Sequence, residues 1–198
     1  MPSSKETILD AIRQNKPEPT ELPSLDQDWQ QFDDPVEHFC NMLKAVGGLA
    51  YQVKNLAEAE DILKQIGCFT QADKISSMVE GMELSTFDVS AIDDPHNLED
   101  LDLAILPGSF AVAENGAIWI DGNKMPHRVM LFIAQHVIIT VPRSQIVHNL
   151  HQAYQKLNKN ERQFGIFVSG PSKTADIEQS LVIGAHGARS ATVFVIED

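Results

Sequence analysis

Apolar residues recur at helical spacing near the start of the chain. In the segment KETILDAIRQ, residues Ile8, Leu9 and Ile12 fall on one face, which predicts a short amphipathic helix. Three prolines follow between residues 17 and 23. They predict an extended connector, because a proline fixes φ and has no N–H to donate.

Local signals then predict a helix, a strand and a second helix. Asp34, Pro35 and Glu37 together form a helix start: an N-cap acid, a proline at the first helical position and a capping-box acid. Gly47 and the glycine after it supply the stop, since a left-handed closing residue is easy for glycine. The predicted elements are a helix over 35–46, a strand over 49–53 and a helix over 56–66 that ends before Gly67.

Beyond residue 102 the apolar runs become short and are separated by turn residues, which favours buried strands. Helical spacing returns from Arg143 to Leu157. A further helix is predicted after the last turn, with Thr174 as its cap and Asp176 and Glu178 in its first turn. Strands that alternate with helices predict an α/β fold, a mostly parallel sheet with helices on both faces. The predicted strands are LAIL, AVA, AIWI, HVIIT, GIFVS and TVFVI.

The composition suits one globular unit with a loosely attached start. A chain of 198 residues with 43% hydrophobic content can bury one core. We therefore predict an N-terminal helix and Pro-rich connector over 1–32 and a single α/β domain over 33–198. The net charge of −13 disfavours nonspecific binding to nucleic acid or to an anionic membrane, because both are polyanions.

Two cysteines, Cys40 and Cys68, are predicted to be reduced, buried thiols. A conventional iron–sulfur cluster takes four cysteine ligands, so no cofactor of this kind is expected on this chain. The start of the chain lacks a basic end followed by an apolar stretch, and no window reaches the length of a membrane span. We expect a cytoplasmic protein.

The stretch from Ser169 to Thr174 runs from an apolar strand through a Gly/Pro/Ser turn, and Lys173 adds a positive charge to it. Backbone N–H groups at a strand-to-helix turn can hold a phosphate or a carboxylate. Neither GxxxxGK[ST] nor GxGxxG is present, so no nucleotide motif is supported. The alternative is capping alone, with Thr174 as N-cap and no ligand.

Histidines offer candidate proton-transfer groups. His186 lies between Gly184 and Gly187, where a ligand can approach closely, although a loop histidine is more often bonded to backbone. His127 and His136 flank the apolar run VMLFIA and are the next candidates. No HxH, HxxxH or HExxH spacing occurs, so no metal site is predicted.

Three stretches, AENG, HVIITVPRSQIV and above all SGPSKTADIE with GAHG, resemble the lactate utilisation protein C family, whose members carry a LUD domain. The resemblance runs from about Leu101 to the C-terminus. It implies a fold related to the superfamily of sugar-phosphate isomerases and CoA transferases. It also implies a part in converting L-lactate to pyruvate, alongside iron–sulfur clusters on separate partner subunits.

The family reads Glu, Thr, Gly where this chain has Glu114, Asn115 and Gly116. A more distant resemblance is to class I CoA transferases, whose nucleophilic glutamate sits in a Glu-Asn-Gly context. Such a glutamate attacks an acyl-CoA to give a mixed anhydride. The structural alternative is that Glu114 caps a turn and Gly116 permits a tight bend.

Three functions therefore stay open: a lactate-utilisation component with a pocket for a small carboxylate or phosphate, a CoA transferase-like enzyme, and a non-catalytic scaffold. The first places its pocket where Glu114, the turn from Ser169 and His186 converge, because open α/β sheets bind ligands at turns that follow strands. The candidate catalytic residues are Glu114 and His186, and the candidate ligand-binding residues are Asn115, Gly116, His136, Ser169, Gly170, Pro171, Ser172, Lys173, Thr174, Asp176 and Gly187.

Overall fold

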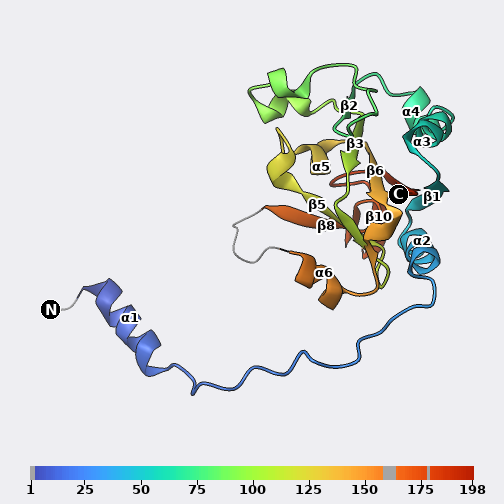
Figure 1. Ribbon diagram of the computed structural model, residues 1–198. Coiled ribbons are helices and arrows are strands. Elements are labelled where there is room, and N and C mark those ends of the chain that lie inside the picture. Colours follow the sequence, from blue (N-terminus) through green and yellow to red (C-terminus); the bar gives the residue numbers. More distant parts are fainter. Residues whose placement is uncertain (1–2, 158–163, 178) are drawn as a thin grey trace.

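Five strands form a parallel sheet at the centre of the computed structural model, which describes residues 3–157, 164–177 and 179–198 (Figure 1). Their order is β1-β11-β6-β3-β2, and every neighbouring pair runs parallel. The predicted α/β fold with a mostly parallel sheet is confirmed. The strands are β1 (Leu49–Val53), β2 (Ile75–Ser77), β3 (Leu103–Pro107), β6 (His136–Pro142) and β11 (Ser190–Ile196).

Helices α3 (Leu56–Leu63) and α4 (Gly67–Thr70) cover one face of this sheet. Side chains of a strand alternate between the two faces, so Ile105, Ile138 and Phe194 point to this side and bury completely against Leu63 and its neighbours. The predicted helix over 56–66 is shorter than expected, because Ile66 has extended backbone before Gly67 starts α4.

The other face packs against α2 (Pro35–Ala45), α5 (Met130–Ile133) and a second sheet. Leu106, Ile139 and Val193 point to this side, where Phe39 and Leu43 of α2 are fully buried. The side chain of Asp34 accepts the N–H groups of Val36 and Glu37, as the helix-start pattern predicted.

The second sheet has the order β7-β4-β5-β8 and covers part of this face in place of a helix. The AVA and AIWI segments form its hairpin: a four-residue turn joins β4 to β5, and a connection this short requires antiparallel pairing. The prediction of helices on both faces is therefore incomplete, because strands also cover part of one face. The strands are β4 (Phe110–Val112), β5 (Ala117–Asp121), β7 (Ile146–Val147) and β8 (Gly165–Val168).

The helix predicted from Thr174 is wrong, because these residues form a β-hairpin. Strand β9 (Lys173–Ile177) pairs antiparallel with β10 (Ser180–Ile183). The side chain of Thr174 does accept the N–H of Asp176 at 3.2 Å, the local bond expected of a cap, but pairing with β10 holds the backbone extended. Glu178, also assigned to that helix, lies outside the described residues.

The helix predicted over Arg143–Leu157 is also largely replaced. A 3-10 turn, η4 (Arg143–Gln145), and the edge strand β7 precede the shorter helix α6 (Leu150–Lys156). The side chain of Asn149 accepts the N–H of Gln152 and starts α6 there. The remaining short elements are the 3-10 turns η1 (Val89–Ala91), η2 (Pro95–Leu98) and η3 (Gly122–Lys124).

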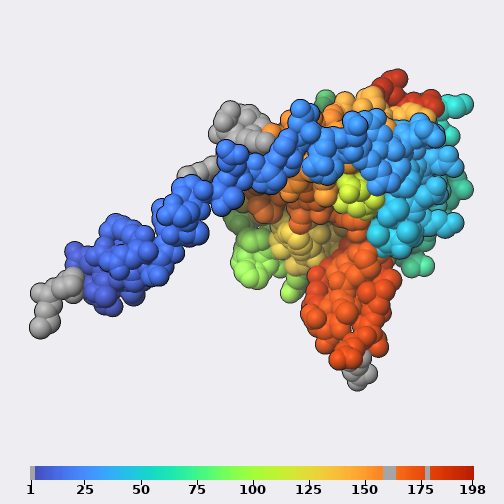
Figure 2. Space-filling model, turned by 90° about the horizontal axis from the view of Figure 1, so that it is seen from below, coloured from blue at the N-terminus to red at the C-terminus, as the bar shows by residue number. Residues whose placement is uncertain are grey.

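Helix α1 (Ser4–Gln14) forms as predicted and projects away from the rest of the molecule on an extended segment (Figures 1 and 2). None of its side chains is buried. The arm meets the body at Trp29, whose ring stacks on His151 with 3.4 Å between ring centroids, and at Phe32, whose N–H donates to Nδ1 of His148. His148 and His151 are thus the contacts of the arm on the body.

Gly116 provides a test of the β4–β5 turn. Its φ of +67° is a left-handed value, and an added Cβ would lie 2.9 Å from the backbone nitrogen of Leu43 in α2. We expect Gly116→Ala to lower the free energy of unfolding by at least about 1–2 kcal/mol, since left-handed backbone alone costs that much. Gly67→Ala is the matched control, because its Cβ would meet nothing within 4 Å. Chemical denaturation measures both, and equal stability of the two variants would contradict this account of the turn.

Candidate functional site

Two loops that sequence analysis singled out line a common cavity of about 310 Å³, here called the loop cavity. One is the β8–β9 loop, with residues Ser169–Lys173, and the other is the β10–β11 loop, with His186 and Gly187. Apolar side chains, among them Phe132 and Phe167, complete the lining. The structure brings the turn from Ser169 and His186 together at this cavity, whereas Glu114, the third part of the predicted pocket, is not in its lining.

Backbone hydrogen bonds hold the two loops together. The N–H of Ser172 donates to the carbonyl of Ala188 at 2.9 Å, and the N–H of Gly184 donates to the carbonyl of Ser172 at 2.9 Å. Pro171 is buried beneath them, whereas His186 is exposed at the rim. The loops therefore have a fixed relative position, with one histidine open to solvent.

Several backbone N–H groups of the loops that line the cavity lack a backbone acceptor. Within the described residues, the N–H groups of Gly170, His186 and Gly187 donate to no backbone acceptor. Gly170 has a φ of +70°, which turns successive peptide groups in a way that other residues rarely allow. Loops with several unpaired N–H groups are common sites for carboxylates and phosphates.

Lys173 supplies the positive charge beside these donors. Its Nζ donates to the carbonyl of Val46 at 2.6 Å and to the carbonyl of Pro171 at 3.3 Å. Burial lowers the pKa of this ammonium group. The two carbonyls fix Lys173 between the C-terminal end of α2 and the β8–β9 loop, so it has a structural contact besides any contact with a ligand.

Glu114 lies apart from the loop cavity. Its carboxylate accepts the N–H of Leu150, the first residue of α6, at 2.9 Å, and its side chain is otherwise exposed. A carboxylate at a helix N-terminus is stabilising, because it pairs with an N–H that has no partner within the helix. This geometry favours the capping role over that of a nucleophile.

Asn115 joins the β4–β5 turn to the loop cavity. Its carbonyl accepts the hydroxyl of Ser169 at 2.8 Å, and its Oδ1 accepts the N–H of Ala117 at 3.1 Å. The β4–β5 turn therefore holds the β8–β9 loop through Asn115. Neither Asn115 nor Gly116 lines the cavity.

His136 and the β9 residues occupy other positions. His136 begins β6, where its Nδ1 lies 2.8 Å from the hydroxyl of Ser190. Burial, and then the cation of Arg189, lower its pKa, while Asp102 acts in the opposite direction. The neighbouring Val137 lines the loop cavity in its place.

The remaining candidates also lie outside the lining of the loop cavity. Thr174 and Asp176 lie on β9. Nε2 of His127 is bonded to the carbonyl of Ile92 at 2.6 Å.

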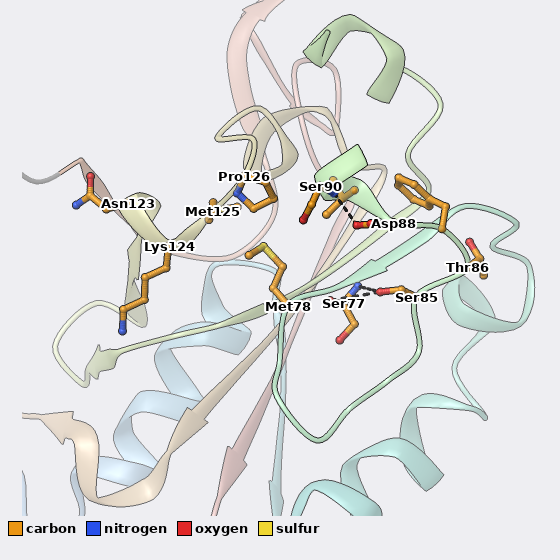
Figure 3. Close-up of a pocket in the computed structure, with 12 residues that line it drawn as sticks. Ser77, Met78, Ser85, Thr86, Asp88, Ser90, Asn123, Lys124, Met125 and Pro126 are labelled. Carbon is orange, nitrogen blue, oxygen red and sulfur yellow. Dashed lines mark hydrogen bonds between the residues drawn. The ribbon is translucent and has the colours of Figure 1, made fainter. Parts of the chain in front are cut away.

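Sequence reasoning missed a larger opening at the carboxyl ends of β2, β3 and β6, here called the carboxyl-edge cleft. It comprises two adjoining hollows of about 840 and 460 Å³ that share Met78, Lys124 and Met125 in their linings. Figure 3 shows the residues that line the larger hollow. The available signal was the Pro-Gly-Ser sequence after the LAIL strand, since ligands bind beyond the carboxyl ends of parallel strands.

No group of three or more His, Cys, Asp or Glu residues suited to a metal ion occurs in the part of the chain that the structure describes. Cys40 and Cys68 are free, partly buried thiols, and burial raises the pKa of both. None of the described helices combines the length and apolar character needed to cross a membrane.

The model of the LUD domain family matches residues 36–196. The chain belongs to this family. Proteins named lactate utilization protein C are similar to it: that of Macrococcus caseolyticus is 31% identical over 130 residues, which are 60% of this chain and 56% of the relative. That of Bacillus pumilus is 27% identical over 143 residues, 68% of this chain and 59% of the relative.

This LUD-domain chain therefore spans little more than half the length of these curated relatives. A crystal structure of a DUF162 family protein from Deinococcus radiodurans superposes with a TM-score of 0.60 at 17% identity. The match covers 82% of this chain and 96% of that protein, and it supports the fold alone.

The capping geometry of Glu114 makes a prediction about stability. We expect Glu114→Ala to lower the free energy of unfolding by about 0.5–2 kcal/mol, the usual cost of losing a helix cap. Glu114→Gln keeps an oxygen acceptor and is expected to lose less. Chemical denaturation measures both variants. Two results together would contradict the capping role. The first is a Glu114→Ala variant as stable as the parent protein, and the second is a covalent adduct of an acyl-CoA on Glu114 of the parent protein, detected by mass spectrometry.

Proposed function

We propose that this chain works in L-lactate utilisation and binds a small carboxylate or phosphate anion in the loop cavity. Two kinds of observation support the proposal: the curated relatives named for lactate utilisation, and the meeting of the two Gly-rich loops around one cavity. The second supports the anion site most directly, because loops with unpaired N–H groups, Lys173 and His186 line the same cavity.

In this proposal the anion accepts hydrogen bonds from the loop N–H groups, and Lys173 adds a favourable charge. His186 at the rim can accept a proton from a bound hydroxyl group or donate a hydrogen bond to it. The apolar wall near Phe132 suits the methyl group of a three-carbon acid. Gly187 lets the two loops approach closely, because a Cβ on it would lie 3.0 Å from the Cβ of Ser172.

Oxidation of lactate to pyruvate removes two electrons and two protons, and the electrons need an acceptor. The resemblance to the lactate utilisation family implies iron–sulfur clusters on separate partner chains. The two cysteines of this chain, fewer than the four thiolates that a conventional cluster takes, agree with that division. This chain then contributes ligand binding, and the partners contribute electron transfer.

Calorimetric titration with L-lactate and with inorganic phosphate tests the binding step. We expect His186→Ala to weaken binding of the preferred anion about three- to ten-fold, because one hydrogen bond contributes roughly 0.5–1.5 kcal/mol. His96→Ala is the matched control. His96 is exposed, its ring bonds to Asp94, and it is not among the residues that line the loop cavity.

Growth tests the biological role. A strain without this gene should fail to grow on L-lactate, and restoring the parent gene should restore growth. Normal growth of the deletion strain, provided that it carries no second copy, would overturn the proposed role. Equal binding by His186→Ala and His96→Ala, or binding of neither anion, would overturn the proposed site.

A further inference from the structure

The carboxyl-edge cleft is a second candidate site, distinct from the loop cavity. Ser77 and Met78 contribute to it from the end of β2, Pro107 to Ser109 from the end of β3, and Pro142 from the end of β6. Its hollows fall within the range of about 300–1,000 Å³ that is usual for ligand sites. It lies where open α/β sheets bind their ligands.

Three of the five hydroxyl groups that line the cleft already bond to the protein, whereas those of Ser90 and Ser109 have no partner among the described residues. The Ser77 hydroxyl donates to the carbonyl of Met82 at 2.7 Å, and the Ser85 hydroxyl accepts the N–H of Ser77 at 2.8 Å. The hydroxyl of Thr86 accepts the N–H of Ile75 at 2.9 Å and donates to the carbonyl of Asp73 at 3.1 Å. These bonds shape the loop after β2, so recognition of a ligand falls to other groups.

Three charged side chains remain: one cation, Lys124, and two carboxylates, Asp88 and Asp121. Lys124 is exposed, and it takes part in none of the ion pairs of the described residues. Each carboxylate has one oxygen held within its own turn, Asp88 by the N–H of Ser90 and Asp121 by Asn123. The second oxygen of each has no partner among the described residues.

This charge pattern selects among ligands. A dianion would meet two carboxylates and a single lysine, which is unfavourable. A monocarboxylate with a hydrogen-bond donor on the next carbon matches both charges. Lys124 pairs with its carboxylate, and Asp121 accepts a hydrogen bond from its donor group. Asp121 and Lys124 both line the smaller hollow.

Apolar side chains surround these charges. Met78 and Met125 line both hollows, and Phe87 and Val89 line the larger one (Figure 3). Methionine adapts its shape readily and makes favourable contacts with aromatic rings. The space beside the head-group position is much larger than a methyl group requires.

We propose that the carboxyl-edge cleft binds a 2-hydroxy or 2-amino monocarboxylic acid with an apolar side group larger than methyl. Its carboxylate pairs with Lys124, its hydroxyl or ammonium group donates to Asp121, and its side group packs against Met78 and Met125. This site and its ligand go beyond the proposed function, which concerns the loop cavity.

Calorimetric titration of the full chain with four acids tests the proposal. L-3-phenyllactate and L-phenylalanine share a side group and differ in the donor, phenylpyruvate has no donor on the second carbon in its keto form, and L-lactate has only a methyl group. We expect one of the first two to bind with a dissociation constant at least about three-fold lower than that of phenylpyruvate or L-lactate, the effect of one modest hydrogen bond or apolar contact.

Variants assign that binding to the cleft. Lys124→Gln should raise the dissociation constant about three- to five-fold, as expected for an exposed ion pair. Lys54→Gln, an exposed lysine elsewhere, should leave it unchanged. Asp121→Asn keeps an oxygen to hold the η3 turn and should remove the preference over phenylpyruvate. His186→Ala should have no effect, which separates this site from the loop cavity.

The proposal is overturned if phenylpyruvate binds as tightly as the two donor-bearing acids, if none of the four binds, or if Lys124→Gln behaves like Lys54→Gln. Any of these results leaves the proposed function standing when phosphate or lactate still binds in a manner that depends on His186. If the preferred acid lost its binding in His186→Ala as well as in Lys124→Gln, the two sites would not be independent. That result would contradict the proposal of a separate cleft.

Discussion

The last turn of α2 is the contact on which the candidate site depends. The carbonyl of Val46 accepts the Nζ of Lys173, and an added Cβ on Gly170 would lie 2.8 Å from that same carbonyl. On the other side, Gly116 approaches the backbone of Leu43 so closely that a Cβ would lie 2.9 Å from its nitrogen. Two turns from distant parts of the chain therefore pack against one helix end, and each does so through a glycine.

This packing explains how the framework behind the loop cavity joins turns more than fifty residues apart. The hydroxyl of Ser169 donates to the carbonyl of Asn115 and joins the two turns directly. The β10–β11 loop then attaches through Ser172. The polar residues of the resulting cavity include Ser169, Lys173 and His186, and the unpaired backbone N–H groups of its loops suit the recognition of a small anion. Glu114 serves the same framework by capping α6.

Much of this could be predicted from local signals. The start of α2 follows from Asp34, and the central strands follow from short apolar runs between turns. The Ser169 turn and His186 were also recognisable, because glycine, proline and a lone lysine stand out in an acidic chain. The helix from Thr174 could not be excluded from the sequence, since its bond to the N–H of Asp176 occurs in helix caps and in turns alike; pairing with β10 decides the outcome. The carboxyl-edge cleft depends on strand order, which places residues near 78, 108 and 124 together and which no local pattern reveals.

The central claim is that the two Gly-rich loops form one anion site. Titration of ¹⁵N-labelled protein with L-lactate or inorganic phosphate, followed through the amide resonances, tests it most directly. The account predicts that the largest saturable shifts belong to the amides of Gly170, His186 and Gly187. Saturable shifts confined to other parts of the chain, or no saturable shift with either anion, would contradict it.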